Sequence, residues 1–305
     1  MKNNNTLDLI KIRNSKFSPY LYIIPAFIFC LTYLFYPIIY SFILSFFQWS
    51  GFTSISSAKF ILFENYKELF KDKIFFLALK NTFLFVFVAI FFQNSLGVAL
   101  AISLNYFKMK FGKAWRAIIF FPAILSPVIV GLVWRLIFAN EGLVNQLLGN
   151  LGLNFLQNIW LANRLTPIWV ITFVNIWQYT GFNMVIYYAG LQSIPEDLIE
   201  AAKIDGASWG HVIFKIIFPL LSATASIAIV LNIIGGFKVF DLVYVMTLGG
   251  PAHSSEVLAS YMYFNSFLMT GPSEMGYAAS LSIVLTIIVF IISLIRIRMT
   301  RDIEY

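Results

Sequence analysis

Charged residues are scarce in this chain, and their scarcity excludes an ordinary soluble protein. Asp, Glu, Lys and Arg together supply 11% of the 305 residues, whereas hydrophobic residues supply 60%. Soluble globular domains carry roughly 25% charged residues. The chain is therefore predicted to be a membrane protein.

The residues and motifs of common catalytic sites are also absent. The sequence has a single cysteine, Cys30, which cannot form an intrachain disulfide. Its only histidines are His211 and His253, and it contains neither a Gly-x-x-x-x-Gly-Lys-Ser/Thr phosphate loop nor a His-Glu-x-x-His pair. We therefore predict no catalytic site, no metal site and no cofactor, and the chain is not expected to be an enzyme.

Long runs without any charged side chain predict the membrane-spanning helices. Each run reaches the roughly 18 apolar residues that cross a hydrocarbon core of about 30 Å. The six runs cover residues 17–58, 81–107, 117–134, 165–195, 216–237 and 275–295. The chain is thus predicted to be an all-α membrane protein with six transmembrane helices. A shorter run, 257–269, contains Ser260, Asn265 and Ser266, so it is interpreted as a re-entrant or interfacial segment.

The distribution of Lys and Arg predicts the orientation of these helices. If the spans alternate in direction, thirteen of the 21 basic residues share one side with both chain ends, and the positive-inside rule makes that side the cytoplasm. The net charge of +7 then reflects juxtamembrane residues beside anionic lipid rather than binding to nucleic acid. The predicted domains are a cytoplasmic tail (1–18), transmembrane helix 1 (19–47), an outer loop (48–80) and a core of five transmembrane helices (81–300).

The core contains one hydrophilic cytoplasmic loop, residues 193–215. The Ser-Ile-Pro-Glu sequence at 193–196 matches a capping box with proline in the first turn, which predicts the start of a helix. We expect this helix to end near Asp205 because Gly206 follows it. Asp205 is expected to cap a second helix that begins at Ala207.

The first helix of this loop has two possible roles. Leu198, Ala201 and Ala202 form a narrow apolar strip with Glu200 beside it. As an amphipathic connector the helix would lie on lipid headgroups with its carboxylates solvated, but such anchors are rich in Lys and Arg. Residues 196–205 hold four acidic residues and one basic residue. This balance favours docking on a protein partner that carries cationic groups.

Two polar stripes within or beside the predicted spans indicate a site. Polar groups are costly in a bilayer and usually face the bundle interior or a water-filled cavity. One stripe consists of Asn175, Tyr179, Phe182 and Asn183 with Gln178 adjacent, and the other of Asn232, Gly235, Gly236 and Phe240. Amides and aromatic rings without a fixed charge suit a neutral polyol. The alternative is that these residues serve helix packing.

Motifs in several places resemble one transport family. Residues 200–206, Glu-Ala-Ala-x-x-Asp-Gly, resemble the EAA loop of the permease subunits of binding-protein-dependent ABC importers. Phe218 stands where that family usually has leucine. Further stretches resemble the carbohydrate-type, MalF-like branch in the same order, among them Phe121-Pro122, Ser126-Pro127, Trp134-Arg135, Gly190-Leu191-Gln192, Phe240-Asp241 and Thr247 to Pro251.

The resemblance implies a type I ABC-importer permease fold in a multi-pass protein of the cell membrane. It implies that the chain moves a sugar or oligosaccharide delivered by an extracytoplasmic sugar-binding protein. Further implied partners are a second permease subunit, which would form a heterodimer, and two separate ATPase subunits. The residues implied to dock on the ATPase are Glu200, Ala201, Ala202, Asp205 and Gly206.

A rival from another class is an ion-coupled secondary transporter. Such a protein would carry ionisable residues within its spans for coupling. The six charge-free runs contain no Asp, Glu, Lys or Arg, so the importer permease is preferred.

Overall fold

The computed structural model of the chain describes residues 18–107, 111–268 and 274–301. Within these residues the chain is helical apart from a two-stranded antiparallel ribbon, in which β1 (Phe47–Gln48) pairs with β2 (Lys59–Phe60). The predicted all-α architecture is therefore confirmed except for this ribbon. Residues 1–17 of the predicted tail and the basic residues Lys108 and Lys110 lie outside the described residues.

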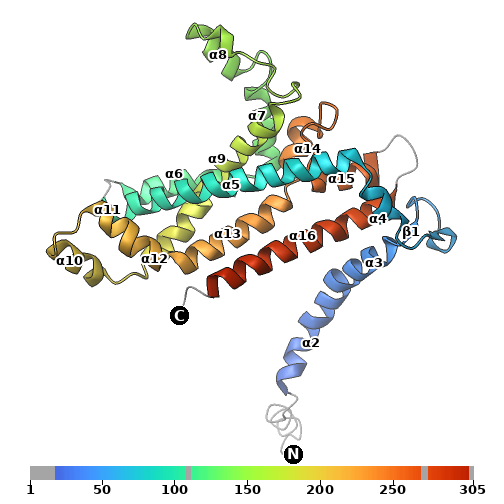
Figure 1. Ribbon diagram of the computed structural model, residues 1–305, viewed down its shortest axis with the longest axis horizontal. Coiled ribbons are helices and arrows are strands. Elements are labelled where there is room, and N and C mark those ends of the chain that lie inside the picture. The colour runs from blue at the N-terminus through green and yellow to red at the C-terminus, as the bar shows by residue number, and fades with distance from the viewer. Residues whose placement is uncertain (1–17, 108–110, 269–273, 302–305) are drawn as a thin grey trace, which may run out of the picture.

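Four long helices form the body of the molecule: α5 (Lys73–Tyr106), α9 (Pro167–Leu191), α13 (Ser222–Phe237) and α16 (Met275–Arg301). In Figure 1, α5, α13 and α16 run roughly parallel along the long axis, and α9 is tilted across them. The shorter α6 (Gly112–Ile124) packs on α9. Apolar side chains on all sides of these helices are typical of helices surrounded by lipid and by one another.

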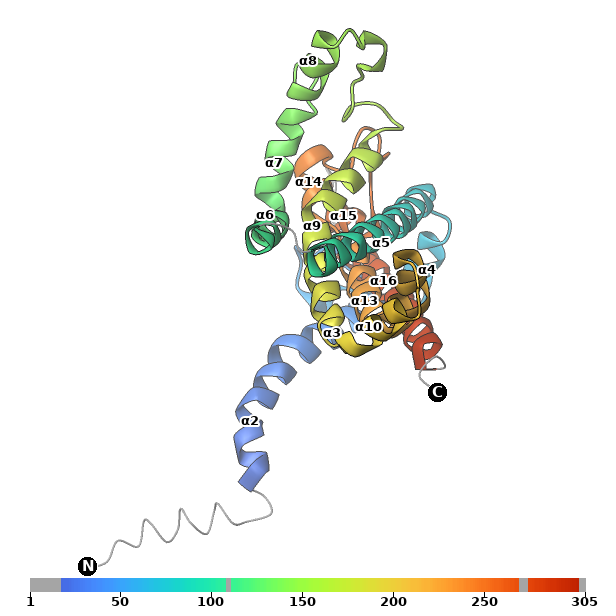
Figure 2. The ribbon, with the colours of Figure 1, turned by 90° about the vertical axis from the view of Figure 1, so that its left-hand side faces the viewer.

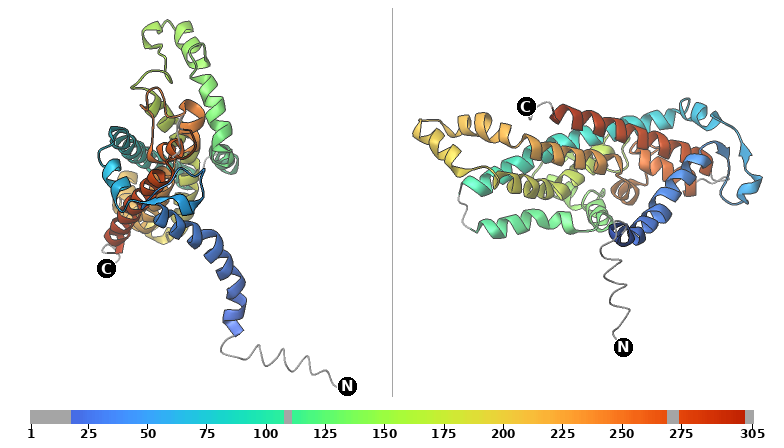
Figure 3. Two further views of the ribbon diagram at one scale, coloured as in Figure 1. Left: turned by 90° about the vertical axis from the view of Figure 1, so that its right-hand side faces the viewer. Right: turned by 90° about the horizontal axis from the view of Figure 1, so that it is seen from below.

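The first apolar helix leaves the bundle as an arm, which Figures 2 and 3 show from three directions. The arm consists of α2 (Ser18–Cys30), a π-helical turn at Leu31–Phe35 and α3 (Tyr36–Leu44), which contacts α16. Only 6% of the most apolar stretch of the arm, which lies within Tyr22–Leu44, is buried in the protein. An apolar surface of this length needs lipid or another apolar helix to cover it.

Two of the predicted spans are bent. The axes of α6 and α7 (Pro127–Ile137) meet at 93°, and the segment Trp209–Leu220 meets α13 at 67°. At the first bend Leu125 and Ser126 have ψ angles of 143° and 131°, directly before Pro127. Proline disfavours a helical conformation in the residue before it. The run 117–134 is therefore broken at Leu125 and Ser126 into two helices.

By length and composition, the described residues contain three helices able to cross a membrane: Tyr22–Leu44, Lys73–Tyr106 and Met275–Arg298. Counting each bent pair as one span gives up to five. The remaining predicted span, 165–195, corresponds to α9, which is not among these five. Its Asn, Gln, Trp and Tyr side chains make it less apolar than these five segments.

The predicted outer loop 48–80 is shorter in the structure because α5 already begins at Lys73. The 34 residues of α5 make a helix of about 51 Å, longer than a hydrocarbon core of about 30 Å. The loop also contains a 3-10 turn at Ile55–Ser57 and the short helix α4 (Glu64–Leu69), where Lys67 Nζ contacts Glu64 Oε1 at 2.6 Å. A short helix is what the Glu and Lys spacing of this loop indicates.

One end of the bundle is held by Asp72, directly before α5. Its carboxylate accepts hydrogen bonds from the hydroxyl of Tyr261, from the hydroxyl of Tyr277 at 2.7 Å and from the Ile74 N–H at 2.8 Å. Burial works against ionisation of Asp72, but these hydrogen bonds outweigh it and hold the pKa of the carboxyl below its usual value. One side chain therefore ties the start of α5 to α15 (Leu258–Tyr263) and to α16.

The run 257–269 belongs to this same end. It forms α15 and a π-helical turn at Phe264–Leu268, and Leu258, Ser260 and Tyr261 are buried. This segment packs against α5 and α16. Its described part is thus a buried element and not an exposed interfacial helix. The remaining helix of the outer part, α8 (Leu143–Asn150), follows α7 and projects from the body, and a 3-10 turn at Asn154–Leu156 follows it.

Glycine permits a backbone contact between α6 and α9. A Cβ atom at Gly181 would lie 2.0 Å from the carbonyl oxygen of Ile119 and 2.8 Å from Phe120 Cα. Small residues of this kind let membrane helices approach closely. The buried face of α9 therefore supports α6 at a position where no larger residue fits.

We expect Gly181→Ala to push α6 away from α9 and to lower the free energy of unfolding by roughly 1–3 kcal/mol, the usual cost of over-packing. Gly112→Ala is the matched control, because a Cβ at Gly112 in the first turn of α6 has nothing within 4 Å. Thermal unfolding of both purified variants in detergent measures the difference. Equal melting temperatures for the two variants would contradict this packing.

Candidate functional site

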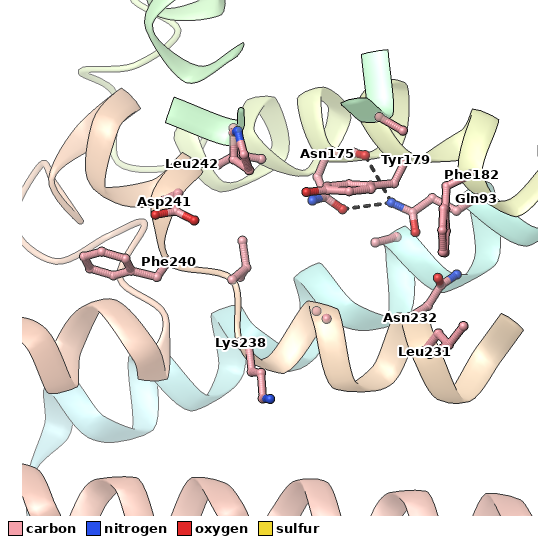
Figure 4. A pocket seen from close by; sticks show the side chains of 16 residues that line it. Gln93, Asn175, Tyr179, Phe182, Leu231, Asn232, Lys238, Phe240, Asp241 and Leu242 are labelled. Atoms are coloured by element: carbon pink, nitrogen blue, oxygen red, sulfur yellow. Dashed lines mark hydrogen bonds between the residues drawn. The ribbon is translucent and has the colours of Figure 1, made fainter. Parts of the chain in front are cut away.

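A cavity of about 370 Å³ lies between α5, α9, α13 and the start of α14 (Asp241–Thr247). Figure 4 shows the side chains around it. Ala123 near the end of α6 and Pro127 at the start of α7 close another side. The bend between α6 and α7 therefore supplies part of the wall.

Most of the predicted substrate-path residues meet at this cavity. Seven of the nine line it: Asn175, Tyr179, Phe182, Asn232, Gly235, Gly236 and Phe240. They come from α9, from α13 and from the link to α14, which the bundle brings together. The two stripes that the sequence placed on separate helices thus face one common space.

Gln178 and Asn183 do not line the cavity, although both were predicted to. Both side chains are fully buried. Gln178 Nε2 donates to the Leu125 carbonyl oxygen at 3.0 Å, and Asn183 Nδ2 donates to the Tyr179 carbonyl oxygen at 3.4 Å. The Cβ of Asn183 also lies against Gly97 of α5. For these two residues the packing alternative fits the geometry.

Gln93 of α5 is a cavity residue that the two stripes did not include. Its Nε2 donates to Asn175 Oδ1 at 2.8 Å and to the Asn175 carbonyl oxygen at 3.1 Å. The signal was present in the sequence, because Gln93 and Asn94 are polar side chains inside the charge-free run 81–107. The rule that polar groups in a bilayer face its protein interior applies to them as well.

The cavity is not free of charge, which corrects the expectation of an amide and aromatic site alone. Lys238 and Asp241 also line it, and both are exposed. No ion pair joins Lys238 to Asp241 in the described part of the chain, so the pair suggested by their spacing does not form. The opposite charges balance each other, and the cavity as a whole stays neutral.

Aromatic rings and one free amide group complete the lining. Phe182 is 39% exposed, and Phe240 stacks on Tyr244 with ring centres 5.2 Å apart. Asn232 Nδ2 is a buried donor without a hydrogen-bond partner among the described residues. A buried unpaired donor is costly, and a ligand that accepts a hydrogen bond would remove that cost. Gly235 leaves open space, whereas a Cβ at Gly236 would lie 3.0 Å from Val86.

The predicted docking helix lies at the opposite end of the bundle from Asp72 (Figure 1). It is α10 (Glu196–Ile204), which begins at the last residue of the predicted capping box and ends directly before Asp205, as the sequence predicts. Gly206 follows with a φ of +80°, a left-handed conformation that suits glycine at a helix end. The chain then continues into α11 (Trp209–Val212), a π-helical turn at Ile213–Ile217, and α12 (Phe218–Leu220).

The predicted capping of these two helices is wrong. Ser193 Oγ donates to the Gly190 carbonyl oxygen at 2.7 Å, at the end of α9, and does not cap α10. Asp205 does not cap the second helix either, which begins at Trp209 and not at Ala207. The cap there is Ser208, whose Oγ accepts from the His211 N–H at 3.3 Å. Ser193 is bonded to the end of the preceding helix instead, and Ser208 rather than Asp205 lies directly before the first turn of α11.

The two sides of α10 differ in composition. Ile199 is buried, Ala202 packs partly against the same apolar cluster, and Lys203 lies over the Trp209 ring with its Nζ 4.3 Å from the ring centre. The outer side carries Ile204, which is 86% exposed, and Glu200. The predicted strip is thus divided, because Ala202 faces inward while Leu198 and Ala201 are exposed. The outer side is apolar and acidic, since its one basic residue folds back.

A helical membrane bundle with a cavity lined by amides and aromatic rings, and with an exposed acidic helix at one end, suits a membrane transport subunit. The chain belongs to the family of binding-protein-dependent transport system inner membrane components, which it matches over residues 93–301. The resemblance seen in the EAA loop is thereby confirmed. The chain is a multi-pass permease subunit of a binding-protein-dependent ABC importer, and ATP is hydrolysed by a separate subunit.

Individual relatives cover nearly the whole chain. The probable ABC transporter permease YurN of Bacillus subtilis is 35% identical, and the match covers 94% of this chain and 97% of YurN. The arabinooligosaccharide transport permease AraP of Bacillus subtilis is 32% identical over 94% of this chain and 90% of AraP. A chain of a bacterial alginate ABC transporter, crystallised with a periplasmic protein that holds an alginate pentasaccharide, aligns with a TM-score of 0.78 at 25% identity and covers 93% of this chain and 94% of that one.

The different roles of Gln178 and Asn232 lead to a prediction. Gln178→Ala leaves the Leu125 carbonyl unpaired, so we expect a loss of roughly 1–3 kcal/mol in the free energy of unfolding. Asn232→Ala removes a donor that has no partner, so it should leave the melting temperature within about 1 °C of wild type and reduce transport instead. Melting temperature and uptake are measured for both variants in the assembled importer. An equal loss of stability in Asn232→Ala would make Asn232 a packing residue.

Proposed function

We propose that this chain is the permease through which an ABC importer moves a sugar or oligosaccharide into the cell. The binding protein outside delivers the substrate, and the cavity between α5, α9 and α13 receives it. The family supplies the transport class, and the roles of AraP in arabinooligosaccharide transport and of the alginate transporter favour saccharides as substrates.

The lining of the cavity is the observation that carries this proposal. Asn175 and Asn232 offer amide groups that bond to hydroxyls, and Tyr179, Phe182 and Phe240 offer rings that cover the apolar face of a sugar. Recognition of an ion would instead need an excess of one charge. Lys238 and Asp241 balance each other, which favours a neutral substrate.

Six membrane spans with both chain ends in the cytoplasm form part of the proposal. The arm, α5, the two bent pairs and α16 supply five spans, and α9 is the sixth. The low hydropathy of α9 is compatible with the membrane because α5, α6 and α13 pack against it. The end that carries α10 would then be cytoplasmic, and the end that carries Asp72 would face outside.

The outer side of α10 is the proposed contact with the ATPase. Its exposed Glu200 and Ile204 suit a cleft that has cationic groups at its rim and an apolar floor. Ala201 allows the partner backbone to approach closely, and Asp205 and Gly206 complete the exposed turn. The proposed assembly contains this chain, a second permease subunit, two ATPase copies and the external binding protein, all held at the membrane lipid.

The substrate class is tested with the complete importer in proteoliposomes. The importer is supplied with ATP, its binding protein and hydrolysates of arabinan, galactan and starch, and the accumulated solutes are identified by mass spectrometry. We expect accumulation of neutral oligosaccharides because the cavity is lined by amides and rings without net charge. A mixture of amino acids serves as the control. Accumulation of amino acids in place of every saccharide would contradict the proposal.

The docking role of α10 is tested by reversing one charge. Glu200→Lys should still insert into the membrane, because Glu200 lies outside the spans, but it places a cation opposite cationic partner groups. Like charges at an interface cost several kcal/mol, so we expect at least a tenfold loss of uptake and of substrate-stimulated ATPase activity. The matched control is Glu196→Lys on the same helix, because its spacing of three and seven residues places Glu196 on the side of buried Ile199 and of Lys203. Equal activity of the two variants would contradict docking through the outer side.

A further inference from the structure

Gln93 is a buried polar residue of the cavity wall whose side-chain amide is fixed by hydrogen bonds. Its side chain is only 3% exposed, yet it reaches the cavity wall from α5. Its side-chain nitrogen donates two hydrogen bonds to one residue, Asn175, on the neighbouring helix α9. Figure 4 shows the two amides facing each other at the edge of the cavity.

These two hydrogen bonds determine how both amides are oriented. The backbone carbonyl oxygen of Asn175 can only accept, so the Gln93 atom 3.1 Å from it must be the NH2 nitrogen. The same nitrogen lies 2.8 Å from the Asn175 side chain, which must therefore turn its oxygen, Oδ1, toward Gln93. An amide orientation is usually ambiguous, but here an atom that cannot donate settles it.

The orientation leaves Asn175 Nδ2 on the side away from Gln93 (Figure 4). Within the described residues the Asn175 side chain makes no other hydrogen bond. Asn232 Nδ2, on the facing helix α13, is likewise a donor without a partner. Of these two donors, the one on Asn175 belongs to a partly exposed residue of the cavity wall, whereas the one on Asn232 is buried.

We propose that Gln93 is a positioning residue that turns Asn175 so that its NH2 group is available to the substrate. The cavity then selects substrates by oxygen atoms that accept hydrogen bonds, which in a saccharide are hydroxyl, ring and glycosidic oxygens. This inference rests on the proposed function of the cavity as the substrate path, and it adds which atoms of the substrate the walls recognise.

The selection has a simple physical cause. A hydroxyl can donate or accept, but a ring or glycosidic oxygen can only accept. Without Gln93 the Asn175 amide can rotate and present its oxygen, which would leave an accepting substrate atom facing another acceptor. Such an unpaired contact in a desolvated site is costly. Gln93 therefore acts on the substrate only through Asn175.

The test is a double-mutant cycle in the complete importer, reconstituted in proteoliposomes. Gln93→Met keeps the length of the side chain and removes its donor, and it is made in the wild-type and the Asn175→Ala backgrounds. The probe is the radiolabelled solute that the wild-type importer accumulates, whatever its class. A solute that is not a saccharide would overturn the proposed function, while the coupling between Gln93 and Asn175 would still be measured.

We expect Gln93→Met to raise the KM for uptake roughly tenfold in the wild-type background, but less than about twofold when residue 175 is alanine. A structural role of Gln93 alone would give the same loss in both backgrounds, and that result would overturn the proposal. Asn175→Asp gives a second test that leaves Gln93 unchanged, because the carboxylate still accepts from Gln93 but offers no donor to the substrate. Its KM should rise as much as that of Asn175→Ala, and a wild-type KM in Asn175→Asp would overturn the proposal.

Discussion

The burial of α9 is the constraint on which the rest of the structure depends. This helix carries three amide side chains along its middle, Asn175, Gln178 and Asn183, and unpaired polar groups of this kind are costly in lipid. Two neighbouring helices pack against it. Gly97 of α5 lies against Asn183 of α9, and Gly181 of α9 lies against Ile119 of α6. Small residues at these crossings bring the neighbouring backbones close enough to exclude lipid from its polar groups.

The same burial divides the polar residues of α9 between two tasks. Gln178 reaches the Leu125 carbonyl, which the bend before Pro127 has released from helical hydrogen bonding. Asn175 instead meets Gln93 and leaves part of its amide for the cavity. The bend between α6 and α7 therefore creates both a carbonyl that needs a donor and a wall of the cavity. Residues of one chemical type serve packing or recognition according to which neighbour they meet.

The two ends of the bundle differ: one carries the exposed helix α10, and the other carries the hydrogen bonds of Asp72. After α10 the chain runs through α11, a π-helical turn and α12 into α13, which carries Asn232 at the cavity. The segment from α10 to the cavity wall is interrupted by a turn at 205–208 and bent by 67° before α13. At the opposite end Asp72 ties α5, α15 and α16 together. This arrangement suits a permease whose energy source is another subunit.

The sequence by itself determined the membrane class, the existence of the helical segments, the bounds of α10 and the transport family, because these depend on composition and on local motifs. It also predicted seven residues of the cavity, since a polar group in an apolar helix is visible in a linear pattern. Only the tertiary structure separated Gln178 and Asn183 from that set, added Gln93 and replaced the predicted caps with Ser208. The physical reason is that a hydrogen bond needs a partner at about 3 Å, and for a side chain inside a bundle that partner comes from another helix, whose position the linear pattern does not contain.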